Sequence, residues 1–198
     1  MDGTLINSGT IISNTINHVR INCGLSPMPQ ELLLTNINNP HINPAQFFYE
    51  TNEFTPKHSQ LFEEYYDKHC IKSIELYDGI EELLKELEKL NYTMSIATNA
   101  SNEFAKKAIG HLGISKYFSF VVGYDDVKKP KPDPQMLNIT MDSLKFSNRK
   151  SMLIGDSHKD LLAAQKANID CHLVNWGFTN HGDDGYANTI DLLNTIVS

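Results

Sequence analysis

The sequence has 198 residues, of which 40% are hydrophobic and 21% charged, and its formal net charge is −7. These values are typical of a globular protein with one domain, or one domain and a small insert. The acidic net charge argues against nucleic acid as a partner, because there is no excess of basic residues to neutralise phosphates. No apolar stretch approaches the roughly 20 residues of a membrane span, so no membrane partner is expected.

Three cysteines, Cys23, Cys70 and Cys171, lie far apart in the sequence and form no Cys-x-x-Cys pair. An odd number of scattered cysteines favours neither a disulfide framework nor a zinc site. Met1 is followed directly by an acidic, turn-forming motif, so no secretory signal is predicted. Together these features predict a protein of the reducing cytoplasm.

The chain begins with Met1-Asp2-Gly3-Thr4-Leu5, and the region that follows, from about Ser8 to Ile74, shows helical patches and no strand alternation. One patch has Ile12, Ile16 and Val19 at helical spacing, and another lies between residues 61 and 70. The Asn- and Pro-rich stretch from Asn36 to Pro44 predicts a turn between helices. We therefore predict a helical domain over residues 8–75, inserted into a domain formed by residues 1–7 and 76–198.

After this insert, short apolar runs alternate with amphipathic segments. The predicted strands are Thr93–Thr98, Phe118–Gly123, Ser151–Gly155 and Cys171–Val174, and the predicted helices are Asp78–Leu90, Ser101–Leu112, Asp133–Leu144 and Ser157–Ala167. Strands separated by single helices indicate an α/β fold with a parallel sheet. Asp78 with Glu81 is a predicted N-cap pair, Ser101 is a predicted N-cap, and Gly113 is expected to end the helix that Ser101 begins.

Polar side chains follow two of the predicted strands, at the end where open parallel sheets bind ligands. Thr98 and Asn99 follow the first, and the hydroxyl of Thr98 could hold phosphate oxygens or form a local turn before Ser101. Asp156 and Asp160 follow the third. They could cap a helix, or bind Mg²⁺, which prefers one or two carboxylates with water and substrate oxygens.

A group of lysines, Lys128, Lys129 and Lys131, precedes the predicted helix at Asp133. Such a run is usually solvated, but in Lys129-Pro130-Lys131-Pro132-Asp133 the prolines restrict the backbone and could aim one ammonium group at a site. A fixed ammonium group stabilises charge on a transferring phosphoryl group.

The segments that carry Asp2, Thr98, Lys129 and Asp156 resemble, in order, the four motifs of the haloacid dehalogenase (HAD) superfamily. The resemblance is greatest to the branch similar to phosphoglycolate phosphatase, and it spans Asp2 to about Phe178. It implies a Rossmann-like parallel sheet with an all-helical cap, and a Mg²⁺-dependent phosphatase that acts on a small phosphorylated metabolite through an aspartyl-phosphate intermediate. Members of this branch often carry a lysine where this chain has Ala100, so the resemblance leaves the substrate open.

The resemblance also implies roles for individual residues. Asp2 is the general acid and base, and its backbone carbonyl is a metal ligand; Asp156 is the second ligand of Mg²⁺. Thr98, Asn99 and Lys129 bind the phosphoryl group, with Lys129 also catalytic. Ser157 and Asp160 support the site, Ser157 through metal-bound water and Asp160 through water or by orienting Lys129.

In this motif the nucleophile is an Asp directly before the residue at Met1, at the end of a central strand. The strands of the second and fourth motifs would flank that strand. Without it, their unpaired backbone groups would each cost on the order of 1–3 kcal/mol. We therefore expect the given chain to lack its nucleophile and its first core strand, and to be inactive alone. A start assigned at an internal methionine would explain this arrangement.

Other functions are weighed against this one. A β-phosphoglucomutase-like phosphotransferase would share every core motif and differ in the cap. A haloacid dehalogenase is disfavoured, because that branch lacks the Asp found here as Asp2. A catalytically inactive binding protein is credible if the native chain begins at Met1. Oligomeric state and physiological substrate are not predicted from the sequence.

Overall fold

The computed structural model describes residues 1–39 and 41–198, and the chain divides into two compact units. Met1–Ile6 and Glu75–Ser198 form the first unit, and Asn7–Ile74 form the second. The sequence predicted these divisions at 1–7 with 76–198 and at 8–75. Two short strands, β1 (Ile6–Asn7) and β2 (Glu75–Leu76), pair with each other where the chain passes between the units.

The second unit, called here the helical unit, is built from helices. They are α1 (Gly9–Asn22), α2 (Gln30–Ile37), α3 (Pro44–Tyr49) and α4 (Pro56–His69). Its core contains Ile16 and Val19 of α1, Leu33 of α2 and Phe48 of α3. The predicted turn between Asn36 and Pro44 contains Pro40, which lies outside the described residues; the flanking helices end at Ile37 and begin at Pro44.

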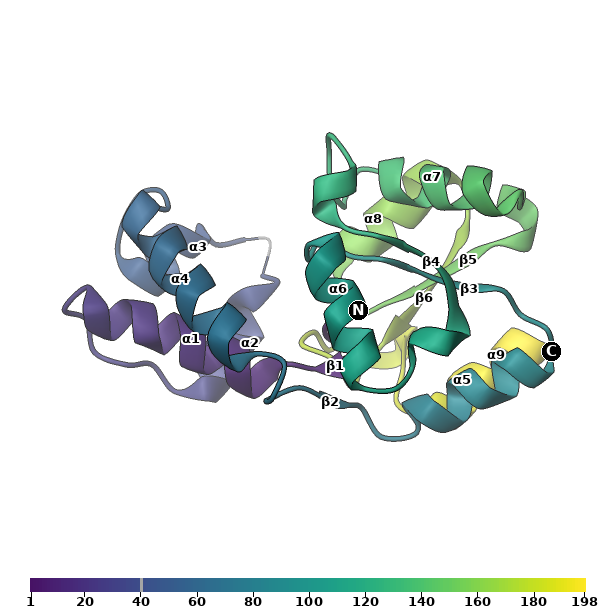
Figure 1. Ribbon diagram of the computed structural model, residues 1–198, viewed down its shortest axis with the longest axis horizontal. Helices are drawn as coiled ribbons and strands as arrows, with labels where there is room; N and C mark the ends of the chain where they lie inside the picture. Colours follow the sequence, from purple (N-terminus) through teal and green to yellow (C-terminus); the bar gives the residue numbers. More distant parts are fainter. Residues whose placement is uncertain (40) are drawn as a thin grey trace. The chain divides into compact units, whose positions relative to one another are not determined.

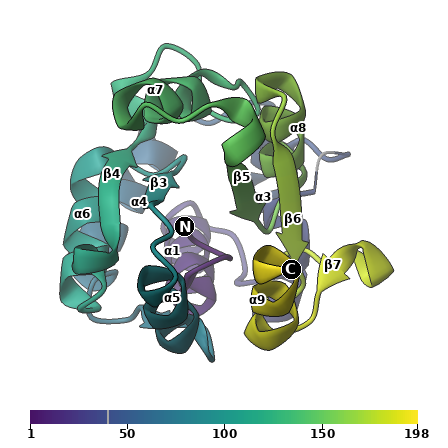
Figure 2. The ribbon, with the colours of Figure 1, turned by 90° about the vertical axis from the view of Figure 1, so that its right-hand side faces the viewer.

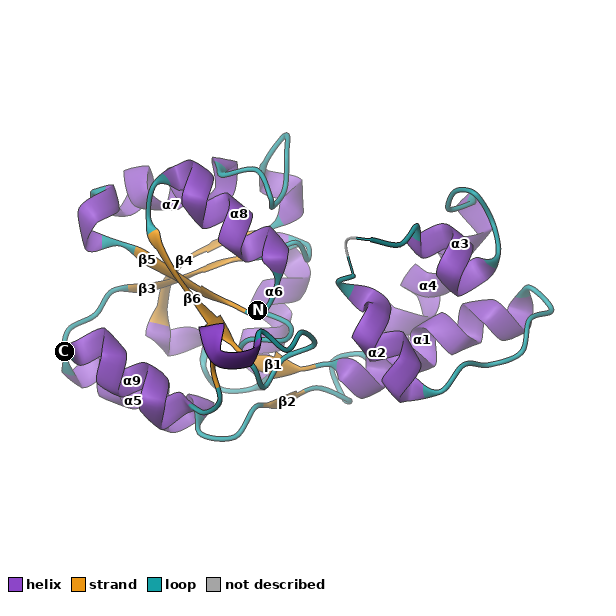
Figure 3. Ribbon diagram, turned by 180° about the vertical axis from the view of Figure 1, so that it is seen from behind, coloured by secondary structure: helices purple, strands orange, loops and turns teal. Residues whose placement is uncertain are grey.

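The first unit, called here the α/β unit, alternates strands with helices, as predicted. The strands are β3 (Met94–Ala97), β4 (Phe118–Val122), β5 (Met152–Gly155), β6 (Asp170–Val174) and β7 (Gly185–Tyr186). The helices are α5 (Ile80–Lys89), α6 (Asn102–His111), α7 (Gln135–Leu144), α8 (His158–Ala167) and α9 (Thr189–Val197). Helices α7 and α8 lie on one side of the strands and α5 and α9 on the other (Figure 1, Figure 3). The α/β fold class is confirmed.

Local signals explain where several of these helices begin and end. The Ser101 side chain accepts a hydrogen bond from Phe104 N at 3.2 Å and caps α6, as predicted. The α6 helix ends before Gly113, whose φ of +72° is in the left-handed region that favours glycine. The predicted cap of α5 by Asp78 is wrong. Gly79, with φ +76°, is the N-cap residue there, and no side chain bonds the free N–H groups.

The strands of the α/β unit do not form one continuous sheet. β3 pairs in parallel with β4, while β5, β6 and β7 form a separate parallel sheet in that order. In the part of the chain that the structure describes, no strand lies between β3 and β5 (Figure 2). Among the described strands, β3 therefore pairs only with β4, and β5 pairs only with β6.

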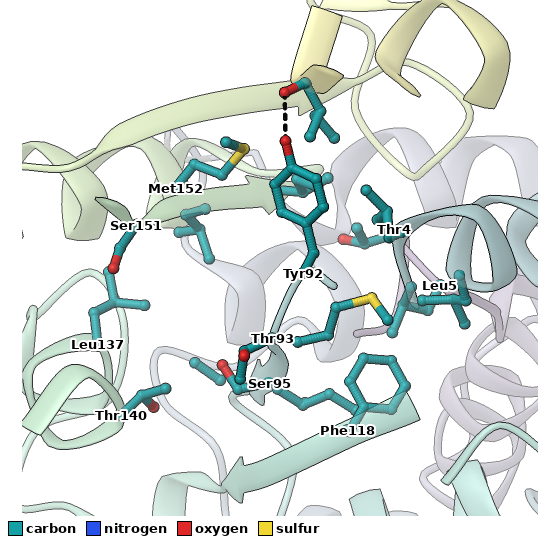
Figure 4. A pocket seen from close by; sticks show the side chains of 18 of the residues that line it. Thr4, Leu5, Tyr92, Thr93, Ser95, Phe118, Leu137, Thr140, Ser151 and Met152 are labelled. Carbon is teal, nitrogen blue, oxygen red and sulfur yellow. Dashed lines mark hydrogen bonds between the residues drawn. The ribbon is translucent and has the colours of Figure 1, made fainter. Parts of the chain in front are cut away.

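A cavity of about 420 Å³ lies between β3 and β5. Residues 93–97 and 151–154 line it, and helices α5, α7 and α9 cover it with mainly apolar side chains (Figure 4). Among the described residues, no helix is long and apolar enough to cross a membrane. The three cysteines are free thiols.

Candidate active site

The polar ends of four segments meet at one edge of the strands in the α/β unit. Asp156 follows β5 directly and Thr98 follows β3 directly, so both stand at carboxyl ends of parallel strands. The turn of residues 129–134 and the N-terminal segment of residues 2–4 complete the arrangement. Contacts between these segments, described below, join them into one candidate site.

Lys131 forms a buried ion pair with Asp160. Its Nζ lies 2.6 Å from Asp160 Oδ1, and both side chains are more than nine-tenths buried. Burial alone would raise the pKa of the Asp160 carboxyl, but the charge and hydrogen bond of Lys131 outweigh it and lower that pKa. The pair therefore stays charged inside the protein, because each partner compensates the other.

Ser157 connects this ion pair to the start of α8. Its hydroxyl donates to Asp160 Oδ2 at 2.6 Å, its backbone N donates to the same oxygen at 3.1 Å, and the Ser157 side chain accepts from Asp160 N. These contacts form a capping box. Asp160 thus has both roles considered from the sequence: it caps a helix and holds a lysine.

Asp156 is the second buried acid of the site. One of its carboxylate oxygens accepts a hydrogen bond from Thr4 Oγ1, and the other accepts from Phe178 N, both at 3.3 Å. Burial raises the pKa of the Asp156 carboxyl, and the negative charge of Asp160 raises it further. No lysine or arginine forms an ion pair with Asp156 among the described residues. A cation bound here would offset the cost of burying this carboxylate.

The structure places Lys131, and not Lys129, in this site. The Lys129 side chain is exposed, and its backbone N donates to Gln135 Oε1 at 3.1 Å. The prediction chose Lys129 because Lys-Pro-x-Pro-Asp fits only from that lysine, although the shorter pattern Lys-Pro-x-Pro also fits from Lys131. Lys131 is buried and paired with Asp160, whereas Lys129 is exposed. Neither the burial nor the contact with Asp160 can be predicted from the sequence of this turn.

Asn99 holds the backbone of Lys131. Its Nδ2 donates to Lys131 O at 2.9 Å, and Lys131 N donates to Asn99 Oδ1 at 3.0 Å. The predicted phosphate-binding residue thus contacts the lysine turn directly. Thr98 is buried, and its Oγ1 accepts from Ala100 N at 3.1 Å, so the local turn considered from the sequence does form. That bond leaves the Thr98 hydroxyl proton available as a donor.

The backbone nitrogen of Met1 lies among the charged groups of the site. Burial lowers the pKa of the Met1 amino group, and the positive charge of Lys131 lowers it further. The carboxylates of Asp2, Asp160 and Asp156 act in the opposite direction. Asp2 itself is half-buried.

Two glycines let the backbone approach Asp156. Gly3 has φ +73°, and a Cβ atom built there would lie 2.1 Å from Asp156 Oδ2. A Cβ atom at Gly177 would lie 2.1 Å from Gly3 O. Any larger residue at either position would displace the carboxylate or the N-terminal segment, so glycine is required for the site's geometry.

Two further residues support the site and were given no role from the sequence. Trp176 Nε1 donates to Thr4 O at 2.9 Å and so anchors the N-terminal segment. His181 Nε2 lies 3.0 Å from the backbone oxygen of Asp156, and Asn175 Oδ1 accepts from His181 N at 2.7 Å. Trp176 lies within the span of the family resemblance, but no sequence signal distinguishes His181 from the other histidines.

In the part of the chain that the structure describes, no three His, Cys, Asp or Glu side chains gather into a metal site. Asp2 and Asp156 are the two predicted ligands. The backbone carbonyl of Asp2 and the carboxylate of Asp156 suit Mg²⁺, which commonly keeps several water ligands and needs few from the protein.

Comparison with known proteins identifies relatives of this chain. The family model described as haloacid dehalogenase-like hydrolase matches residues 1–174. A phosphoglycolate phosphatase of Photorhabdus laumondii is 30% identical over 99% of this chain and 89% of its own length.

Solved structures show the same fold. A predicted phosphatase from Clostridium acetobutylicum has a TM-score of 0.84, with 23% identity over 100% of this chain and 95% of its own. A predicted phosphoglycolate phosphatase from Haemophilus somnus has a TM-score of 0.85, with 21% identity over 99% of this chain and 95% of its own.

Proposed function

Because the chain belongs to the haloacid dehalogenase-like hydrolase family, we propose that it contributes the site of a Mg²⁺-dependent phosphatase for small phosphomonoesters. The observation that carries the proposal is the buried Lys131–Asp160 pair together with the buried carboxylate of Asp156. A fixed ammonium group and an unpaired buried carboxylate within one site can hold a phosphate dianion and a divalent cation together. The phosphoglycolate phosphatase relative supports the reaction class.

Lys131 and Thr98 hold the phosphoryl group in this proposal. Asp160 fixes the Lys131 ammonium group, and Asn99 fixes its backbone, so the positive charge needs no rearrangement when substrate binds. Preorganised charge of this kind stabilises a transferring phosphoryl group more than mobile charge does. The Thr98 hydroxyl donates to a phosphate oxygen while its own oxygen accepts from Ala100 N.

Asp2 and Asp156 would hold Mg²⁺. The fit rests on Asp156, which is buried, has a raised pKa and accepts only two hydrogen bonds of 3.3 Å in the described contacts. When bound, the cation would neutralise charge on the phosphoryl oxygens. Thr4 and Phe178 position the Asp156 carboxylate by their hydrogen bonds, and Gly3 leaves it room.

The attacking group is a carboxylate on a residue joined to the Met1 nitrogen. Met1 and Lys131 both line the cavity between β3 and β5, which supports this position for the attacking group. A carboxylate oxygen forms a bond to phosphorus as the bond to the leaving alkoxide breaks, and Asp2 gives the alkoxide its proton. Asp2 then removes a proton from water, which attacks phosphorus and releases phosphate with regeneration of the carboxylate. Asp2 is the residue of this mechanism that the given sequence includes.

The helical unit is the proposed cap. It contains none of the site residues, and in cap-bearing hydrolases such a unit excludes water and contacts the leaving group. Substrate selection would then depend on the helical unit, while phosphoryl transfer would depend on the α/β unit.

The experiment compares three proteins: the 198-residue chain, the same chain extended by an apolar strand ending in Asp, and the extension ending in Asn. Each is assayed with p-nitrophenyl phosphate, 2-phosphoglycolate and glucose 1-phosphate, with Mg²⁺ or with EDTA. We expect Mg²⁺-dependent phosphate release only from the extension ending in Asp. Equal release by all three proteins would show that another residue attacks. Conversion of glucose 1-phosphate to glucose 6-phosphate without phosphate release would indicate a mutase instead.

A further inference from the structure

The loop between β6 and β7, residues 175–184 and called here the β6–β7 loop, contacts Asp156 at two places. Phe178 N donates to Asp156 Oδ2 at 3.3 Å, and His181 Nε2 lies 3.0 Å from the backbone oxygen of Asp156. Asp156 follows β5, which pairs in parallel with β6, so the loop starts beside the residue that it contacts. The loop therefore holds both the side chain and the main chain of the second predicted metal ligand.

The contact between His181 and Asp156 has a defined direction. A carbonyl oxygen can only accept, so the proton of this hydrogen bond is on His181 Nε2. Asp156 is buried, and a buried backbone oxygen without a partner is costly. His181 supplies such a partner from a position 25 residues further along the chain.

Asn175 fixes the backbone on either side of His181. Its Oδ1 accepts from His181 N at 2.7 Å, and its Nδ2 donates to Gly182 O and to Gly185 O, both at 2.8 Å. The amide thereby uses its oxygen and both of its N–H donors inside the loop. The imidazole of His181 therefore reaches Asp156 from a backbone that one side chain holds at three points.

The orientation of the Asp156 carboxylate depends on these contacts, because the side chain is short and its direction follows from the backbone that carries it. Mg²⁺ requires nearly octahedral geometry, so it binds less well to a carboxylate that is displaced. Residues that hold a metal ligand in place commonly change metal affinity by about 10- to 100-fold when they are replaced.

We propose that His181 is a positioning residue for Asp156 and that Asn175 acts through it, so that the β6–β7 loop sets the affinity of the site for Mg²⁺. This inference rests on the proposed function, in which Asp156 is a ligand of Mg²⁺. His181 touches neither the cation nor the phosphoryl group. It acts by holding the backbone oxygen of Asp156, and it lies outside the four motifs that predicted the site.

The first test measures Mg²⁺ affinity of the 198-residue protein by isothermal titration calorimetry. His181→Ala should bind Mg²⁺ at least about tenfold more weakly than the unchanged protein. His181→Gln should bind nearly as well as the unchanged protein, because the Gln amide N–H can donate to Asp156 O in place of the imidazole. Thermal unfolding without Mg²⁺ verifies that each variant is folded.

The matched control is His172→Ala. His172 is also a half-buried histidine of the α/β unit, and its Nδ1 lies 3.2 Å from Tyr186 OH, but it contacts Asp156 in none of the described hydrogen bonds. This variant should keep the Mg²⁺ affinity of the unchanged protein. An equal loss in His172→Ala, no loss in His181→Ala, or a loss in His181→Gln as large as in His181→Ala would each overturn the role of His181.

A double-variant cycle tests whether Asn175 acts through His181. Asn175→Ala should also weaken Mg²⁺ binding, and the double variant Asn175→Ala/His181→Ala should bind no more weakly than the weaker single variant. Changes that act through one shared contact are not additive, whereas independent changes are. Additive losses would show that Asn175 acts by another route and would refute that part of the proposal.

Amide hydrogen exchange in the absence of Mg²⁺ separates this inference from the proposed function. Phe178 N, which donates to Asp156 Oδ2, should exchange faster in His181→Ala and at the original rate in His181→Gln. If the unchanged protein binds no Mg²⁺, the proposed function fails, and the exchange at Phe178 still decides whether His181 positions Asp156. Unchanged exchange at Phe178 in His181→Ala would refute the positioning role whether or not the cation binds.

Discussion

The Lys131 ammonium group and the Asp160 carboxylate lie 2.6 Å apart and are almost completely shielded from water. Asp160 also accepts from the Ser157 hydroxyl and backbone N, so three donors converge on one carboxylate. Removing one partner of such a pair leaves an uncompensated buried charge, which is far more costly than losing a surface ion pair. The stability of the α/β unit and the position of its lysine therefore depend on the same contact.

Replacing Lys131 by Ala should destabilise the protein by about 3–5 kcal/mol, because Asp160 would keep its burial and lose its cation. The matched change Lys129→Ala should alter the free energy of unfolding by less than about 0.5 kcal/mol, because that side chain is exposed. Urea unfolding followed by Trp176 fluorescence measures both. If the free energy of unfolding falls by similar amounts in the two variants, the choice of Lys131 over Lys129 as the lysine of the site is not supported.

Lowering the pH should destabilise the protein through protonation of Asp160. Its pKa is lowered in the folded state, so the stability it contributes is present above the ordinary pKa of Asp and is lost as pH falls through the folded pKa. Between pH 7 and pH 3, the free energy of unfolding should therefore decrease less in Asp160→Asn than in the unchanged protein. Glu103→Gln is the control, because its partner Lys107 lowers the pKa of Glu103 at a fully exposed site where solvent screens the pair. If both variants reduce the pH dependence of the unfolding free energy equally, the buried pair is not the source of the acid sensitivity.

Gly3→Ala should cost more than Gly113→Ala. Both glycines have positive φ, +73° and +72°, so both variants bear the strain of a side chain in the left-handed region, about 1–3 kcal/mol. Only at Gly3 does the added Cβ meet another group, since nothing lies within 4 Å of the site at Gly113. The difference in unfolding free energy between the variants measures the cost of displacing Asp156. No difference would show that the N-terminal segment moves aside freely.

Much of this fold could be predicted because its signals are local. The alternation of apolar runs with amphipathic segments located β3 to β6 within one residue, and Ser101 and Gly113 marked the ends of α6. The cap of α5 was wrong because Gly79 adopts a left-handed conformation, which places the helix start after Asp78. Asp78, directly before Gly79, is a residue type that commonly caps helices, so the sequence favoured it over Gly79 as the N-cap residue.

The site was harder to predict, since its contacts join residues distant in sequence. Choosing between Lys129 and Lys131 requires knowing which one faces Asp160, which lies 29 positions from Lys131. His181 reaches a backbone oxygen and belongs to no motif.

The metal proposal leads to the last prediction. Asp156→Asn, made in the chain extended by a strand ending in Asp, should lower Mg²⁺ affinity by at least about tenfold, because an amide replaces a buried carboxylate ligand of a hard cation. The fold should persist, since Asn keeps an oxygen that can accept from Thr4 Oγ1 or Phe178 N. Isothermal titration calorimetry with MgCl₂ measures the affinity without turnover.

The control for this prediction is Asp183→Asn, which removes one negative charge from an exposed position in the loop between β6 and β7. It should leave Mg²⁺ affinity unchanged, because a screened surface charge contributes little to a site it does not touch. Thermal unfolding with and without MgCl₂ gives a second reading: the cation should raise the melting temperature of the extended protein and of Asp183→Asn, but not that of Asp156→Asn. If Asp156→Asn binds Mg²⁺ as tightly as the control does, the buried carboxylate of Asp156 serves to hold Thr4 and Phe178 in place, and the metal ligands must be sought elsewhere.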